Sequence, residues 1–402
     1  MRRRTFLRKS ALLSAGFVLN PMIYERSENY KNLKVVTLTG SPRKRGQIYG
    51  ETLKKEISEI VALWKENLQR FRSVNPDNYI KEFLDNTNFT KAIKKWTPDL
   101  LDEVKGIAEG TGIDFKTIFA YQLGDEEWWY GRNRRFGITL PEQRECSAIG
   151  VFKQKGIPPL LAQNMDIPVY TDGYQVLLHI KHEKSSLESF VFTFAGYIAT
   201  TGVNNHSIGI CCNTLLQLNP SPAGLPVAYI VRGVLAQKTY KDAIKFIQNV
   251  KHASGQNYTI GGPEEIVDFE CSANKVKRFI PYRGATEVYH TNHPIVNDDQ
   301  SIFKEILKKI PPERRRKHPT NSEIRLNTIK KRIKESSGKI TVETIKSILS
   351  SHDDPDNPIC NHKRQKRGAF TAGCLIMELS ETPVLHLAPG PPCSTEFETF
   401  RF

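Results

Sequence analysis

The sequence has no pair of cysteines in CxxC spacing. Its seven cysteines are odd in number and irregularly spread, and Cys211 and Cys212 are adjacent inside an apolar run. This pattern favours buried free thiols over a disulfide framework. Because no CxxC occurs, the sequence also indicates no metal site, and we expect no cofactor.

Acidic residues are in the minority, with 43 Asp and Glu against 58 Lys and Arg, so the formal net charge is +15. The positive charges cluster in runs at 311–319, 330–335 and 362–368. We interpret these runs as solvated loops and helix faces, with a patch for an anionic partner as the alternative. The sequence has no zinc-finger spacing, helix-turn-helix pattern or basic–aromatic interleaving, so we expect no nucleic-acid partner.

Long apolar runs are also missing. The apolar run Ala11–Leu19 is shorter than the roughly 20 residues that span a bilayer, and no cysteine follows it to carry a lipid. Paired arginines followed by Thr5-Phe6-Leu7 resemble a twin-arginine export signal. We therefore predict that residues 1–32 form an export signal, that the protein is periplasmic or extracellular, and that it has no stable membrane anchor.

The sequence pattern changes near residue 146. Before it, a short strand is predicted at 33–40, helical patterns follow up to about residue 72 and at 79–95 and 98–110, and a further helix starts at residue 114. After it, strands are predicted at 147–152, 159–165, 174–182, 189–196, 207–214, 265–272, 286–293, 373–380 and 383–389, and helices at 225–250 and 322–350. This pattern is typical of an α+β fold of layered sheets and helices, in which segments 33–145 and 146–402 form one joint domain.

A single cysteine, Cys146, stands where the pattern changes, and Asp166 follows it at a short distance. A lone cysteine of this kind is usually a small core residue. If Cys146 is instead a nucleophile, it needs a base to form the thiolate. The base could be a histidine of "YHTNHP" (His290 or His293), or the α-amine of Cys146 itself after cleavage of the preceding peptide bond. An α-amine, with a pKa of about 7.7–8.0, is a suitable base near neutral pH.

Four stretches of the chain resemble the isopenicillin-N acyltransferase family of autoproteolytic N-terminal nucleophile hydrolases, which is related to choloylglycine hydrolase and acid ceramidase. They are "AQNMD" after Cys146, "GVNNHSIGICCNTL", "YHTNHP" and "NSEIRLNTI", of which "YHTNHP" is the most specific. The resemblance extends from about residue 34 to the end of the chain. It implies a four-layer αββα fold and a precursor that cleaves itself between Glu145 and Cys146.

The resemblance also implies roles for five residues of this sequence. Cys146 would be the nucleophile, its new α-amine would be the base, and Asp166 would hydrogen-bond that amine. Asn292 would donate to the oxyanion, and Asn213 would be a second donor or a substrate contact. Arg325 would support the site electrostatically.

These roles predict cleavage of a small N-acyl amide through a thioester. We favour water over an amine as the acyl acceptor, because acyl-coenzyme A is scarce outside the cytoplasm. Two alternatives stay open: a Cys–His hydrolase that works without self-cleavage, and a non-enzymatic exported basic protein that binds anionic envelope polymers. Aromatic side chains that could line the substrate pocket are Trp128, Trp129, Tyr130 and Tyr170.

Overall fold

The computed structural model describes residues 33–134, 146–183, 185–311, 318–336, 338–362 and 368–402. The predicted export signal and Glu145 lie outside the described residues, so both stay predictions. Among the described helices, none is both long enough and apolar enough to cross a bilayer.

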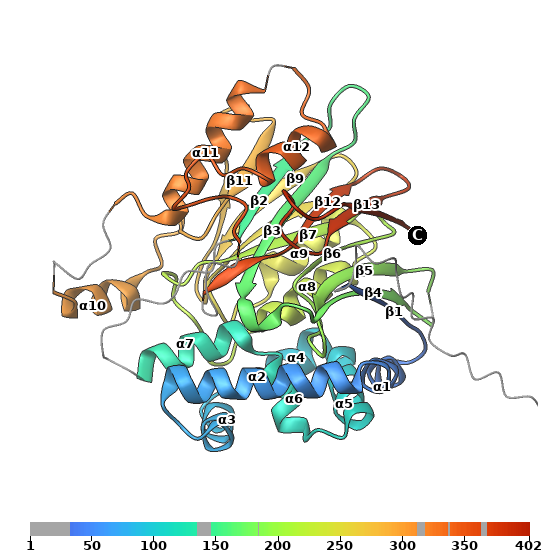
Figure 1. Cartoon of the computed structure of the whole chain (residues 1–402), viewed down its shortest axis with the longest axis vertical. Coiled ribbons are helices and arrows are strands. Elements are labelled where there is room, and N and C mark those ends of the chain that lie inside the picture. The colour runs from blue at the N-terminus through green and yellow to red at the C-terminus, as the bar shows by residue number, and fades with distance from the viewer. Residues whose placement is uncertain (1–32, 135–145, 184, 312–317, 337, 363–367) are drawn as a thin grey trace, which may run out of the picture.

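Two β-sheets pack face to face (Figure 1). The first has eight strands in the order β1-β4-β5-β6-β7-β8-β9-β10, and the second has six in the order β11-β2-β3-β12-β13-β14. Strands β2 and β3 of the second sheet contact β7 and β8 of the first. The bounds are β1 (Lys34–Leu38), β2 (Ser147–Val151), β3 (Leu160–Pro168), β4 (Gln175–Lys181), β5 (Glu188–Phe194), β6 (Thr201–Asn204), β7 (Gly209–Thr214), β8 (Gln256–Gly261), β9 (Ile266–Cys271), β10 (Val276–Phe279), β11 (Glu287–His290), β12 (Ala369–Glu378), β13 (Val384–Ala388) and β14 (Glu398–Arg401).

Helices cover the outer face of each sheet. Helix α8 (Val227–Leu235), with α9 (Tyr240–Asn249) packed on it, contacts β6 and β7. On the other side, α11 (Asn321–Glu335) contacts β11, and α12 (Val342–Leu349) contacts β3 and β12. The order helix, sheet, sheet, helix confirms the predicted α+β fold with four αββα layers.

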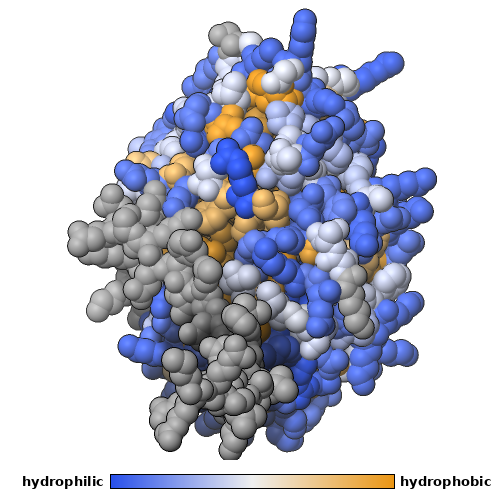
Figure 2. Space-filling view, turned by 90° about the vertical axis from the view of Figure 1, so that its right-hand side faces the viewer, coloured by the Kyte–Doolittle hydropathy of each residue, from blue (hydrophilic) through white to orange (hydrophobic). Residues whose placement is uncertain are grey.

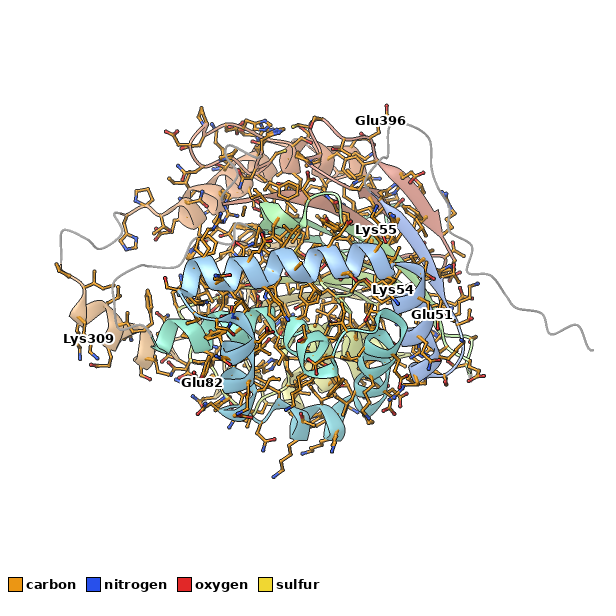
Figure 3. The ribbon with its side chains drawn as sticks, turned by 60° about the horizontal axis from the view of Figure 1, so that its bottom comes forward. Glu51, Lys54, Lys55, Glu82, Lys309 and Glu396 are labelled. Carbon is orange, nitrogen blue, oxygen red and sulfur yellow. The ribbon has the colours of Figure 1, made fainter. Side chains whose placement is uncertain are left out.

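The first third of the chain is helical, as predicted, and forms a group below the sheets in Figure 1. Its helices are α1 (Pro42–Thr52), α2 (Lys54–Arg72), α3 (Pro76–Asp85), α4 (Phe89–Trp96), α5 (Pro98–Thr111), α6 (Phe115–Tyr121) and α7 (Gly124–Arg134); α10 (Ser301–Lys309) lies apart from them. Figure 3 shows their outer side, where Glu51, Lys54, Lys55 and Glu82 are labelled. In Figure 2, hydrophilic residues cover most of the coloured surface, with small apolar groups between them.

A buried carboxylate joins this helical group to the rest of the fold. Glu103 of α5 accepts hydrogen bonds from Arg232 of α8 at 2.6 and 3.0 Å and from Arg45 of α1 at 3.1 Å. Burial alone raises the pKa of Glu103, but the charges of Arg232 and Arg45 outweigh it and lower the pKa below its usual value. This network fixes the helical segment and the β-rich segment in one core.

A second buried carboxylate, Glu126 of α7, has no cationic partner among the described residues. Its Oε1 atom accepts hydrogen bonds from the Ser254 hydroxyl at 2.8 Å and the Val227 amide at 3.2 Å. Burial nevertheless raises the pKa of Glu126 to about 7. In the folded protein, Glu126 is therefore protonated over a pH range in which the unfolded chain is ionised.

We expect Glu126→Gln to remove a pH dependence of stability. The folded pKa of Glu126 lies above its ordinary value of 4.5, so its ionisation weakens folding as the pH rises from about 4.5 to about 7. The difference in the free energy of unfolding, Glu126→Gln minus wild type, should therefore be about 3 kcal/mol larger at pH 8 than at pH 4. Urea unfolding at both pH values measures this, with the exposed Glu66→Gln as control; equal differences at both pH values would contradict the prediction.

The sequence predicted most of the sheet but missed the strands β6, β8, β10 and β14. Strand β8 is fully buried yet carries polar residues. Its Gln256 donates to Asp125 at 2.6 Å and its Asn257 donates to Asp268 at 3.1 Å. These partners on α7 and β9 satisfy the polar side chains, so β8 is buried although its sequence lacks the apolar pattern that predicts a buried strand.

Candidate active site

Cys146 lies immediately before β2, and β2 forms an antiparallel hairpin with β3 in which Ser147 is opposite Asn164. This register brings the Cys146 side chain against Asp166 near the end of β3. The Cys146 Sγ atom is 3.4 Å from the Asp166 amide nitrogen and 3.6 Å from its carbonyl oxygen. The structure therefore brings together the first two predicted site residues, both buried.

The Asp166 carboxylate is held by a residue that the sequence did not reveal. Thr371 of β12 is paired with Asp166 across the sheet, and its hydroxyl donates to Asp166 Oδ1 at 2.7 Å. The Thr371 hydroxyl also accepts a hydrogen bond from the Asn361 amide at 2.9 Å. Thr371 is 205 residues from Asp166 in sequence, so only the pairing of β12 with β3 identifies it.

Arg325 of α11 is fully buried and reaches Cys146 from the helix side. Its Nη1 atom donates to the Cys146 carbonyl and to the Ser147 hydroxyl, both at 2.9 Å. Its Nη2 atom donates to Asn292 Oδ1 at 3.1 Å. A guanidinium can hold several acceptors in a fixed geometry, so Arg325 joins the predicted nucleophile to the predicted oxyanion donor.

Asn292 follows β11, and three contacts fix its orientation. Its main-chain N–H donates to the Ser322 hydroxyl at 2.7 Å, and its side-chain Nδ2 atom donates to the Thr214 carbonyl at 3.1 Å. Arg325 occupies its Oδ1 atom, so the Nδ2 group faces away from the guanidinium with one further N–H to donate. Asn292 is therefore oriented as a hydrogen-bond donor.

Asn213 lies at the end of β7 in the other sheet, next to Thr214. Its Nδ2 atom donates to the His290 carbonyl at 3.4 Å, and its buried Oδ1 atom has no hydrogen-bond partner among the described residues. Asn213 thus borders the site through His290, which precedes the loop that carries Asn292. Its predicted role as a second donor or substrate contact stays a prediction.

The two histidines of "YHTNHP" make hydrogen bonds to residues other than Cys146. Both ring nitrogens of buried His290 are occupied, by Glu270 at 2.9 Å and the Thr291 carbonyl at 2.8 Å. Burial alone lowers the pKa of His290, but the hydrogen bond and charge of Glu270 raise it overall. His293 Nδ1 lies 2.7 Å from the Ser322 hydroxyl, and burial lowers the pKa of His293 to about 4. Both histidines therefore support the loop that carries Asn292.

A hollow of about 490 Å³ opens on the α11 side of this loop. Its lining residues are His293, His318, Pro319, Glu323, Leu326 and Asn327. None of the predicted aromatic lining residues belongs to this hollow. Trp129 is buried, and the Tyr130 hydroxyl donates to Glu82 at 3.0 Å. Their contribution to a substrate pocket stays a prediction.

The four-layer αββα fold places Cys146 directly before the central β2–β3 hairpin. The chain belongs to the family described as acyl-coenzyme A:6-aminopenicillanic acid acyl-transferase, which matches residues 152–382 and thus more than half of its length. This confirms the predicted family. The match begins after Cys146, so it does not test the identity of the nucleophile.

Individual relatives are more distant. Protein dcd1A of Dictyostelium discoideum is 24% identical over 236 residues, which are 50% of this chain and 49% of that protein, so the match spans about half of its length. A mutant form of conjugated bile acid hydrolase from Clostridium perfringens is similar with a TM-score of 0.41 and 12% identity, over 63% of this chain and 97% of that one. Penicillin V acylase from Agrobacterium tumefaciens has a TM-score of 0.37 and 11% identity, over 61% and 82% of the two chains.

We expect Arg325→Lys to lower activity by about 10²-fold while the chain still folds, because one ammonium cannot hold Cys146, Ser147 and Asn292 together. The loss should fall mainly on kcat, since Arg325 acts through Asn292 and Cys146. Steady-state kinetics on an amide substrate measures the effect. Arg332→Lys is the control, because Arg332 lies on the same helix as Arg325 but pairs with Asp353 near the protein surface. Its activity should stay within about twofold of wild type. Equal kcat values for the two variants would contradict the role of Arg325.

Proposed function

We propose that this protein is a cysteine N-terminal nucleophile amidohydrolase that first cleaves its own Glu145–Cys146 bond. The observation that carries this proposal is the β2–β3 hairpin, which places the Cys146 thiol 3.4 Å from the main-chain nitrogen of Asp166. A newly formed α-amine on Cys146 would lie on the same residue as the thiol and next to this carboxylate residue. The occupied nitrogens of His290 favour an α-amine over that histidine as the base.

Self-cleavage proceeds in two steps. The Cys146 sulfur attacks the Glu145 carbonyl carbon, the C–N bond breaks, and the nitrogen takes a proton to become the free α-amine. Water then attacks the resulting thioester, giving a carboxylate on Glu145 and restoring the thiol. The Arg325 hydrogen bond to the Cys146 carbonyl helps to keep the residue in place while its amide bond is exchanged.

Turnover repeats this chemistry on an N-acyl amide. The α-amine takes the thiol proton, sulfur attacks the acyl carbon, and the leaving amine takes the proton as the thioester forms. Asn292 donates to the oxyanion of the tetrahedral intermediate. Water then releases the carboxylic acid, and we propose water over an amine because the N-terminal sequence supports export to the periplasm.

Mass spectrometry of the purified full-length protein, followed by incubation with a panel of N-acyl amides, tests the proposal. We expect two fragments separated before Cys146, release of amine and acid in equal amounts, and a hydroxamate when hydroxylamine traps the thioester. An intact chain that hydrolyses amides would favour a Cys–His hydrolase. An intact, inactive chain retained by an anionic polymer in a salt-sensitive way would favour the binding protein.

A further inference from the structure

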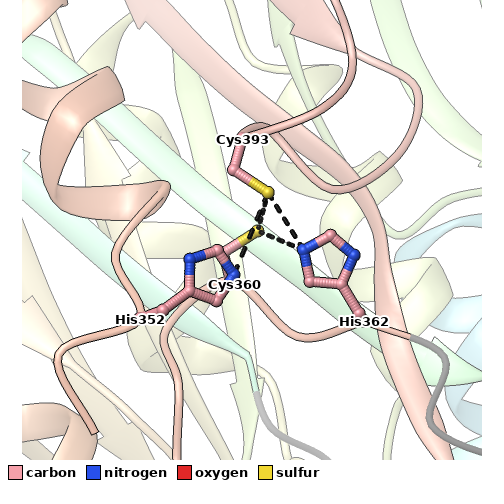
Figure 4. A group of neighbouring side chains, drawn as sticks. All are labelled: His352, Cys360, His362 and Cys393. Atoms are coloured by element: carbon pink, nitrogen blue, oxygen red, sulfur yellow. Dashed lines mark hydrogen bonds between the residues drawn. The ribbon is translucent and has the colours of Figure 1, made fainter. Parts of the chain in front are cut away.

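Four side chains that the proposed reaction does not use form one cluster (Figure 4). His352, Cys360 and His362 come from the segment after α12, and Cys393 comes from the segment between β13 and β14. Their ligand atoms all lie within 4.8 Å of one another. Two segments that are about 30 residues apart in sequence thus place two thiols and two imidazoles around one point.

The distances between these atoms fit the edges of a small tetrahedron. The two sulfurs are 3.4 Å apart, and Cys393 Sγ is 3.0 Å from His362 Nε2 and 3.9 Å from His352 Nε2. Cys360 Sγ is 4.0 Å from His362 Nε2. Tetrahedral zinc with Zn–S bonds of about 2.3 Å and Zn–N bonds of about 2.0–2.1 Å requires edges of about 3.3–3.8 Å. The observed distances lie on both sides of this range, so small side-chain rotations would complete the tetrahedron.

The two thiols and two imidazoles of this cluster indicate which metal ion it would bind. Thiolate and imidazole ligands in a tetrahedral arrangement favour zinc over magnesium and calcium, which prefer oxygen ligands in larger shells. A Cys360–Cys393 disulfide would use the two sulfurs but would not explain why two imidazoles lie against them. The rings of His352 and His362 are stacked, with centroids 5.2 Å apart and an angle of 23° between their planes.

We propose that His352, Cys360, His362 and Cys393 bind one Zn²⁺ ion in a structural site. Four protein ligands leave no open position for a substrate or an activated water, so the ion would join segments rather than take part in catalysis. It would join the segment after α12 to the segment before β14. The sequence predicted no metal site because these ligands are spread over more than 40 positions without a CxxC pair.

The position of this site gives it a second consequence, which rests on the proposed function. Asn361 stands between two of the ligands; its amide donates to the Thr371 hydroxyl at 2.9 Å, and its carbonyl accepts from the Thr371 amide at 2.9 Å. The Thr371 hydroxyl in turn donates to Asp166. A metal ion that fixes Cys360 and His362 would therefore hold Asn361, Thr371 and the Asp166 carboxylate in place.

Metal content of the full-length protein, purified under reducing conditions and equilibrated with zinc, tests the site. We expect about one zinc per chain, and after replacement by Co²⁺ a thiolate-to-cobalt charge-transfer band. Cys393→Ser and His352→Ala, both at exposed positions, should each weaken zinc binding at least about tenfold and remove or shift that band. Cys271→Ala and His318→Ala, which change a thiol and an imidazole outside the cluster, should keep the metal.

Three results would overturn the metal site: no zinc above background in the wild-type protein, equal zinc affinity in wild type and Cys393→Ser, or a Cys360–Cys393 disulfide in protein that binds no zinc. These readouts do not depend on enzymatic activity. If zinc binds but the chain stays intact and inactive on amides, the proposed function fails and the metal site stands. If both hold, Cys393→Ser should lower kcat as well as the melting temperature, and an unchanged kcat would contradict the link to Asp166.

Discussion

Cys146→Ala should yield a single uncut chain whose amide-hydrolysing activity is at least about 10³-fold below that of the processed wild type. The thiol is the atom that attacks in both self-cleavage and turnover, so removing it stops both reactions. The side chain is small and already packed among buried residues, so alanine should leave the fold intact. Intact-mass measurement and initial rates on the same preparation give the two readouts.

Two further variants make the result specific. Cys146→Ser keeps a hydroxyl nucleophile and should show slow or partial processing, whereas Cys271→Ala, a buried thiol on β9, should be processed like wild type. Full activity in an uncut Cys146→Ala chain would reject Cys146 as the nucleophile. The Cys–His alternative would also be rejected for Cys146, and another group would have to carry the chemistry.

Asp166→Asn should lower kcat by about 10²–10⁴-fold, the second largest effect that we expect. Asparagine keeps the size of the side chain and an oxygen that can accept from Thr371, but it removes the negative charge beside the proposed α-amine. A nearby carboxylate favours the protonated amine, so its loss should lower the pKa of the amine and move the acid limb of the kcat profile to lower pH.

Kinetics across pH on processed enzyme measure this shift. Processing itself can be bypassed if residues 33–145 and a chain starting at Cys146 are expressed together. Asp172→Asn, in the turn that follows β3, is the matched control and should keep both kcat and the pH profile. A drop in kcat without any shift in the profile would mean that Asp166 has only a packing role.

The local part of the site could be predicted from sequence. The β-rich runs at 147–152 and 159–165 predicted two strands after Cys146, and in the structure the β2–β3 register places Cys146 beside the main chain of Asp166. The resemblance also pointed to Asn292 and Arg325, which the structure joins by a hydrogen bond. Asn213 approaches the same loop from the opposite sheet, through the His290 carbonyl, and how far it reaches toward the substrate could not be read from its local sequence.

The sequence alone therefore determined the helical first segment, the layered α+β class and the two strands that follow Cys146. Periodicity and turn residues act over a few positions, and closing a short loop costs little conformational entropy. Tertiary structure alone decided that Thr371 supports Asp166, that Arg325 reaches Cys146, and that His352 and Cys393 meet. These contacts depend on which distant strands pair and which helix covers them, and burial of the whole core, rather than any local pattern, fixes that choice.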